Sequence, residues 1–481
     1  QERTPQRRSR FNKALVTKGR EAFQIACVHC HDEERSFSKI KSLSTWRATV
    51  RRMAAKDGAD IHPSDTSAIA TYLASRNSLS LDTKMGNSSQ GELANQIGHD
   101  TDHLDVATDN QSIVPDISIN GTISTLFRGA DDNHVIENQG FFVDAWISAN
   151  WQPEGPLSAS LTACTSCHSD DSAMGGGGFT VELVEASATL DLIHAIKKTP
   201  AECGWEAKLK AGRFIVPFGG FAAMSHPGAY RTLTNPLMYN MGRRVLGTTG
   251  VAGPPRQPVL PMPYSDEGAD LKIKVPLLPK VSATIDLYAV NGLQQSGPDL
   301  RFFFPSRSYV DNNALPAFGG RAQISTPSVQ FGGSLMTGEA QFDGTTTEPI
   351  LYQLSGVDVT ARYQDLLRFY FEYAIRTNTR KLSPALPPLG RRTMVFGTIS
   401  EAEIKLWDQP RVGLLARYDT LDFRDTFVAA PPAEPQIERF TWGFNFTLGG
   451  GSLLMLNHER WILPDPEKEV DVFGFRWVGT F

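Results

Sequence analysis

The stretch Arg439-Phe440-Thr441-Trp442-Gly443-Phe444-Asn445-Phe446-Thr447-Leu448 alternates large apolar side chains with polar ones. A period of two places one kind of side chain on each face of a β-strand. The same alternation returns in residues 281–289, 367–376 and 401–406. Many polar faces carry full charges, and many apolar faces carry aromatic residues near their ends, which is typical of strands between lipid and water. The sequence therefore favours an all-β transmembrane barrel over a soluble β-sandwich, which the same period also allows.

The spacing of the strands supports a barrel. We count about 16 antiparallel strands after residue 116, the even number that bacterial outer-membrane barrels have. The tight connections at 278–280, 327, 364–365, 408–409 and 449–450 alternate with long ones at 216–268, 292–316, 338–350, 377–393 and 421–435. Short periplasmic turns and long extracellular loops are expected in such barrels. One connection, 193–203, is too long for its place in this order, and it contains Cys203.

Composition narrows the function classes. The 481 residues carry a net charge of −5, so a basic surface that would bind nucleic acid is not expected. No segment approaches the roughly 18 consecutive apolar residues of a transmembrane helix, whereas alternating barrel strands never produce such a run. The polar start, Gln1-Glu2-Arg3, has no feature of a secretory signal and is typical of a processed chain end.

Four of the five cysteines lie in two C-x-x-C-H motifs, Cys27-Val28-His29-Cys30-His31 and Cys164-Thr165-Ser166-Cys167-His168. In c-type cytochromes the two thiols bind the haem edge covalently and the adjacent histidine binds the iron. Half of a zinc site or a thioredoxin-like pair also uses C-x-x-C, but neither needs the following histidine. We therefore predict two covalently attached c-type haems, one held by Cys27, Cys30 and His31 and one by Cys164, Cys167 and His168.

The surroundings of the first motif are informative. Residues 19–23 precede it with helical spacing, and Trp46, Val50 and Met53 follow it, before Tyr72 and Leu73. This order resembles class I cytochromes c, in which a Trp-x-x-x-Val-x-x-Met stretch supplies the second axial ligand and a Tyr-Leu helix closes the fold. By that resemblance Met53 is the sixth ligand of the first haem iron. A core methionine is the alternative interpretation of Met53, and His62 is the rival ligand.

The second motif is followed by four glycines and no closing helix, so we predict a haem on a loop, residues 164–177. If both chain ends are periplasmic, a loop between the third and fourth strands is extracellular. His134, in the first outer loop, is our first candidate for the sixth ligand, and Met174, Met224 and His226 are the others. Without a protein ligand the iron would have an open position, and the haem would be catalytic.

The last strand, with Phe473, Phe475, Trp477, Gly479 and Phe481 on one face, resembles the C-terminal strand of outer-membrane barrels. Residues 209–219 resemble a stretch of phosphate-selective-type porins. A one-haem cytochrome domain joined to such a barrel resembles the fused cytochrome–porins of the outer membrane, best known for oxidising extracellular ferrous iron. The second haem motif departs from that family, whose usual member has one haem.

The resemblance implies a monohaem cytochrome c domain at 1–85, a linker at 86–115 and an outer-membrane barrel at 116–481. It implies electron transfer from extracellular ferrous iron or another redox donor to a periplasmic cytochrome or copper carrier, as in an iron:cytochrome c oxidoreductase. The cytochrome domain would lie in the lumen or on the periplasmic side. The alternatives are a solute porin with a regulatory or plugging haem domain, and a periplasmic haem enzyme. A solvated linker is the favoured interpretation of the segment that contains His99 and His103, and a metal site is the alternative.

Overall fold

The computed structural model describes most of the chain. It covers residues 13–26, 43–54, 61–62, 65–85, 117–131, 139–153, 155–165, 181–197, 205–226, 228–239, 258–260, 264–295, 303–305, 315–340, 350–380, 392–408, 411–425, 436–449, 451–464 and 467–481. The chain divides into two compact units, Gln1–Ser118 with Trp151–Gly155, and Ile119–Asn150 with Pro156–Phe481. Among the described helices, none is both long and apolar enough to cross a membrane.

The described part of the first unit contains three helices, α1 (Lys13–Ala26), α3 (Leu43–Ala54) and α4 (Thr66–Met85). They share one apolar core, which Phe23, Trp46, Val50, Ile69, Tyr72 and Leu73 dominate and against which Met53 packs. On α3 the core residues recur at Trp46, Val50 and Met53, the spacing that places side chains on one face of a helix.

Helices α1 and α4 pack closely. A side chain at Gly19 would overlap the backbone of Ala68, so the absence of a Cβ there permits the contact. One turn along α1, the rings of Phe23 and Tyr72 lie 5.6 Å apart between centroids. Lys18 of α1 also forms a 2.9 Å ion pair with Asp65, next to the start of α4.

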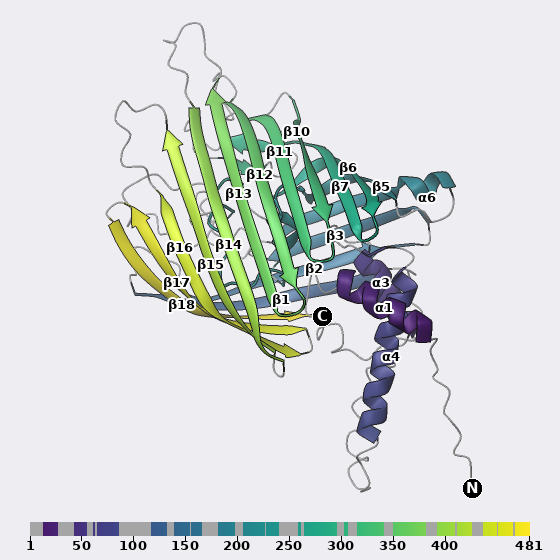
Figure 1. Cartoon of the computed structure of the whole chain (residues 1–481). Coiled ribbons are helices and arrows are strands. Elements are labelled where there is room, and N and C mark those ends of the chain that lie inside the picture. The colour runs from purple at the N-terminus through teal and green to yellow at the C-terminus, as the bar shows by residue number, and fades with distance from the viewer. Residues whose placement is uncertain are drawn as a thin grey trace, which may run out of the picture. The chain divides into compact units, whose positions relative to one another are not determined.

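The second unit is a closed barrel (Figure 1). It has 16 strands, which confirms the prediction of about 16, and the neighbouring strands whose residue pairing is described are antiparallel. Its strands are β1 (Ile117–Ala130), β2 (Gly140–Trp151), β3 (Leu157–Thr165), β4 (Val181–Asp191), β5 (Glu206–Ile215), β6 (Ser265–Leu278), β7 (Val281–Val290), β10 (Ala317–Ser325), β11 (Val329–Ala340), β12 (Ile350–Tyr363), β13 (Leu367–Arg380), β14 (Arg392–Asp408), β15 (Arg411–Asp425), β16 (Ile437–Gly449), β17 (Ser452–Pro464) and β18 (Glu467–Thr480). The first and last strands pair with each other, from Thr122 opposite Thr480 to Ala130 opposite Val472, and this pairing closes the barrel. Two short strands, β8 (Leu293–Gln295) and β9 (Phe303–Pro305), form a separate two-stranded sheet.

The faces of the strands alternate as their sequence predicts. On β13, Leu367 and Phe369 are each 37% exposed on the outside, whereas Glu372 and Arg376 of the same strand are fully buried inside. The aromatic face of β18 also lies outside, because Phe473 and Trp477 are exposed. An apolar outer surface around a polar interior is the arrangement of a barrel that faces lipid.

Most connections keep the predicted alternation, but β17 and β18, whose connection falls among the long ones, are separated by residues 465–466 alone. The other tight connections, such as 279–280, 364–366 and 450–451, lie at the end of the barrel where β1 begins and β18 finishes, which we call the short-connection end. At the opposite, long-connection end, β3 is followed by β4, β5 by β6, β7 by β10 and β13 by β14, and the chain segments between these strands are residues 166–180, 216–264, 291–316 and 381–391. The connection after β4, too long for the short-connection end, contains a short helix, α6 (Leu192–Lys197). Asp191 accepts a 2.9 Å hydrogen bond from the backbone N–H of His194 at the start of this helix.

Candidate functional site

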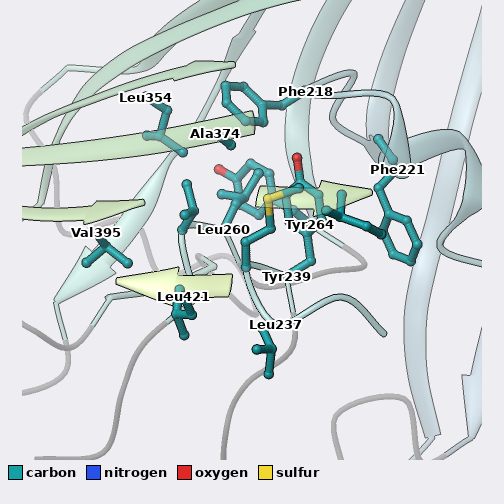
Figure 2. Packing of buried hydrophobic residues seen from close by; sticks show 14 of the residues in the cluster. Phe218, Phe221, Leu237, Tyr239, Leu260, Tyr264, Leu354, Ala374, Val395 and Leu421 are labelled. Atoms are coloured by element: carbon teal, nitrogen blue, oxygen red, sulfur yellow. The ribbon is translucent and has the colours of Figure 1, made fainter. Parts of the chain in front are cut away.

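The connection between β5 and β6 folds into the barrel. We call its described residues, 216–226, 228–239, 258–260 and 264, the inner loop. Figure 2 shows its side chains against inward-facing residues of the barrel wall. The loop contributes Phe218, Phe221, Leu237, Tyr239, Leu260 and Tyr264 to this core, and the wall contributes Leu354, Ala374, Val395 and Leu421.

Glu372 of β13 binds the beginning of the inner loop. Its carboxylate accepts hydrogen bonds from the backbone N–H groups of Gly220 and Phe221, each at 3.2 Å, and from the hydroxyls of Tyr239 and Tyr370. Burial, and next the Glu372 carboxylate, raise the pKa of Tyr239 well above its ordinary value, so this hydroxyl remains a donor. The carboxylate therefore connects two parts of the inner loop to one strand.

Gly219 lies directly beside this carboxylate. Its φ is +71°, a conformation that side chains disfavour, and a Cβ there would overlap Glu372 and the Tyr239 hydroxyl. The N–H of Gly219 donates to Ser334 Oγ at 3.0 Å. Arg321 binds the same Ser334 hydroxyl and pairs with both carboxylate oxygens of Asp358, at 2.5 and 2.8 Å. The beginning of the loop is thus enclosed by polar groups from β10 to β13.

Three buried arginines hold the middle of the inner loop. Arg417 of β15 donates to the Thr232 hydroxyl and the Thr234 carbonyl, and Arg476 of β18 donates to the Thr232 carbonyl. Arg439 of β16 donates to the Thr234 hydroxyl and the Asn235 carbonyl, and it pairs with Asp419 at 2.6 Å. All three arginines are at most 1% exposed. Guanidinium groups suit this role because their donors point in several fixed directions.

Several inward-facing charges on the other side of the barrel, on β4 to β6, stay partly exposed, although Asp266 and Asp270 of β6 are buried. Lys208 pairs with Glu206 at 2.9 Å, Lys210 with Glu185 at 3.4 Å, and Lys272 with Asp286 at 3.4 Å. The side chains of the three lysines, Glu185 and Glu206 remain 13–25% exposed. They alternate with outward-facing residues such as Leu209, so their exposed atoms meet water inside the barrel.

Cys164, the first cysteine of the second motif, lies at the long-connection end of β3. Its side chain points into the barrel and is fully buried in a small cluster with Trp146 and Val184. Its sulfur forms a disulfide bond, and the other four cysteines lie outside the described residues. Because one sulfur cannot form both a disulfide and a thioether, haem attachment at this motif requires the reduced thiol.

His226 of the inner loop is near this cluster, since its ring packs on Trp146 with centroids 4.9 Å apart. Its Nδ1 accepts the Gly228 N–H at 3.0 Å, and its Nε2 lies 3.3 Å from the Thr122 hydroxyl. With Nδ1 accepting, the neutral ring carries its proton on Nε2, and neither nitrogen is then free to bind iron. The arrangement indicates that His226 attaches the inner loop to β1.

Met224 lies away from the second motif. Its sulfur accepts a hydrogen bond from Arg368 at 3.1 Å, and β13, which carries Arg368, is on the opposite wall of the closed barrel from β3. His134, Met174, Cys167 and His168 lie outside the described residues. The sixth ligand predicted for the second haem therefore stays a prediction.

The first motif, Cys27 to His31, also lies outside the described residues, but its flanking elements are described. Helix α1 ends at Ala26, directly before Cys27. Met53 is partly buried and packs on the same core as Trp46 and Val50. A methionine thioether is a haem-iron ligand in c-type cytochromes, and the packing of Met53 on this core fits both that role and the alternative of a core methionine. His62, the rival ligand, is partly buried too. These residues fit the predicted cofactor.

Other predicted features have no structural test. Cys203, His99 and His103 are outside the described residues. Within the described ranges, no group of three or more His, Cys, Asp or Glu side chains has the geometry to hold a metal ion.

The sequence did not reveal which polar residues hold the inner loop. Glu372 and Arg368 are predictable as inward-facing charges from their strand period, but their partners lie more than 130 residues away in sequence. One signal was present, because the connection 216–264 is unusually rich in aromatic and other apolar residues for a surface loop.

Comparison with known proteins yields structural similarity only. No protein-family model matches the chain, and no curated protein matches it. Among solved structures, the channel DcaP of Acinetobacter baumannii is 8% identical, with a TM-score of 0.48, and covers 76% of this chain and 97% of its own. OmpT of Vibrio cholerae, also 8% identical, has a TM-score of 0.44 with the same coverages. OmpF of Salmonella typhi, solved with daunomycin, is 8% identical with a TM-score of 0.43, again with those coverages.

Proposed function

We propose that this protein is a dihaem cytochrome–porin fusion of the bacterial outer membrane. It would conduct electrons between an extracellular donor, ferrous iron or another redox partner, and a periplasmic cytochrome or copper carrier. Its activity would be that of an iron:cytochrome c oxidoreductase. The closed barrel with its apolar outer surface supports the membrane location and argues against a soluble haem enzyme.

One observation carries the proposal. The second C-x-x-C-H motif begins with an inward-facing cysteine at the long-connection end, whereas the chain enters the barrel at the short-connection end. The apolar band of such barrels is roughly 25 Å tall. A second redox centre within this span would divide it into shorter steps, which a single centre could not do.

In this proposal the cysteines attach the haems, and the histidines and Met53 bind the haem irons. Cys27 and Cys30, and Cys164 and Cys167, attach the two cofactors, while His31 and His168 supply the first axial nitrogens. Met53 supplies the thioether ligand of the first site, and His134 is proposed for the second. Bound haem would supply reversible one-electron transfer at each site.

The test uses liposomes that contain the purified protein and an internal, membrane-impermeant oxidised dye. Ferrous iron is added outside without oxygen, and absorbance reports the dye. The proposal predicts dye reduction that is lost in Cys164→Ser/Cys167→Ser and retained in the control Cys203→Ser. Haem content per chain is measured in parallel. Reduction that persists in the double variant, or one haem per chain in the unaltered protein, would contradict a role for the second motif.

A solute porin is the second candidate, and the partly exposed charges of β4 to β6 favour it. Water that reaches Lys208, Lys210 and Glu206 also provides a path for small ions. Planar-bilayer conductance distinguishes the two functions. A steady open-channel current with no electron transfer would favour the porin.

A further inference from the structure

Helix α3 has two chemically opposite faces. Trp46, Val50 and Met53 face the core, whereas Arg47 and Arg51 are exposed and lie one helical turn apart on the other side. Among the three described helices of this unit, α3 alone contains no acidic residue, and its sequence adds a third arginine, Arg52. The two side chains of this helix that are described as exposed, Arg47 and Arg51, are therefore both cationic.

This charge differs from that of the rest of the chain. Residues 1–85 contain 16 basic and 9 acidic residues, a net charge of +7, whereas residues 86–481 contain 31 basic and 43 acidic residues, a net charge of −12. A cationic face on a protein that is acidic as a whole attracts anionic partners over about a Debye length, roughly 10 Å at 0.1 M salt.

The position of this face suits electron exchange. An α-helix with its side chains is about 10 Å wide. A partner bound to Arg47 and Arg51 would therefore be separated by one helix from the core face that carries Met53. Arginine also binds carboxylates through two parallel hydrogen bonds, which orients a partner as well as attracting it.

We propose that the solvent-facing side of α3, defined by Arg47 and Arg51, is the docking surface for an acidic soluble electron-carrier protein. The inference rests on the proposed function, since it assigns a partner to the first haem site. The proposed partner is an acidic protein and not a lipid surface, because electron exchange needs a redox centre close to α3 and a lipid surface has none.

The experiment measures electron exchange between the full chain in nanodiscs and plastocyanin, an acidic copper protein, by stopped-flow absorbance. Arg47→Glu/Arg51→Glu should lower the second-order rate constant about tenfold or more at low salt. The ratio of the rate constants of the unaltered protein and this variant should approach one at about 1 M salt, where the Debye length is about 3 Å.

The matched control is Arg20→Glu/Arg76→Glu, which changes the net charge equally at exposed positions of α1 and α4. It should change the rate constant less than about threefold. Equal losses in both variants would mean that only net charge matters, which overturns the docking surface.

Two further measurements separate the outcomes. If the unaltered protein holds no haem, the proposed function itself fails. If haem is present, and Arg47→Glu/Arg51→Glu loses binding to anionic phosphatidylglycerol vesicles but keeps its rate constant with plastocyanin, the face binds lipid and the inference is wrong. Helical circular dichroism confirms that each variant is folded.

Discussion

Two walls of the barrel interior carry the same kinds of side chain in different environments. On the loop-bound wall, β10 to β18, Glu372, Arg417 and Arg439 are fully buried and bind the inner loop. On the solvated wall, β4 to β6, Lys208 and Lys210 pair with strand neighbours and stay partly exposed. The difference shows that the position of the inner loop, rather than the strand sequence, decides whether an inward charge is structural or meets water.

The largest effect should follow from Glu372→Ala, which removes the acceptor of four hydrogen bonds in a buried site. Each buried donor left without an acceptor typically costs about 1–3 kcal/mol. We expect a lower free energy of unfolding and faster proteolysis within residues 216–239. The control Glu206→Ala, on the solvated wall, should change neither by much. Equal behaviour of the two variants would remove the distinction between the walls.

Arg439→Lys should have the next largest effect. Lysine keeps the charge but cannot bind Asp419, Thr234 and Asn235 together, because its donors radiate from one nitrogen. We expect a loss of about 1–3 kcal/mol in unfolding free energy, the cost of leaving buried polar groups unpaired. Denaturant titration in detergent measures it, with Lys210→Arg as the matched exchange on the solvated wall.

Gly219→Ala should destabilise the protein by about 1–3 kcal/mol, because alanine is strained at a positive φ and its methyl group would displace the Glu372 carboxylate. Gly129→Ala is the control, since a Cβ there meets no atom within 4 Å. Thermal unfolding of both variants compares them. A stable Gly219→Ala protein would show that the loop's attachment to Glu372 is loose.

The smallest effect on stability should come from Lys210→Met on the solvated wall. Its ion pair with Glu185 is partly exposed, so we expect a loss of about 0–1 kcal/mol. The expected change is instead in ion selectivity, because removal of a cation from a water-lined surface favours cation passage. Reversal potentials under a salt gradient measure this. No shift in a conducting barrel would mean that ions do not pass along this wall.

Much of the fold was predictable because strand alternation is a local property. The pattern in residues 367–376 places Phe369 outside and Glu372 inside without reference to any other part of the chain. The connection lengths likewise placed the end of β3 at the long-connection end. The short helix α6 was not predicted, because residues 193–203 show only an unusual length.

The candidate site was less predictable. The two C-x-x-C-H motifs are visible in sequence because haem attachment needs neighbouring residues at one spacing. Axial ligands from other segments have no such local signal. His226 illustrates this, since only its contacts with Gly228 and Thr122 show that both ring nitrogens are engaged.

The sequence by itself determined the strand period, the approximate strand number, the cationic face of α3 and the residues of both motifs. Each of these depends on residues within a few positions of one another. Only the tertiary structure decided that residues 216–239 fold inward, that Glu372 binds their backbone, and that the solvated wall stays open to water. Those outcomes depend on contacts between residues more than 100 positions apart, and no local pattern specifies which distant partner an inward-facing side chain will meet.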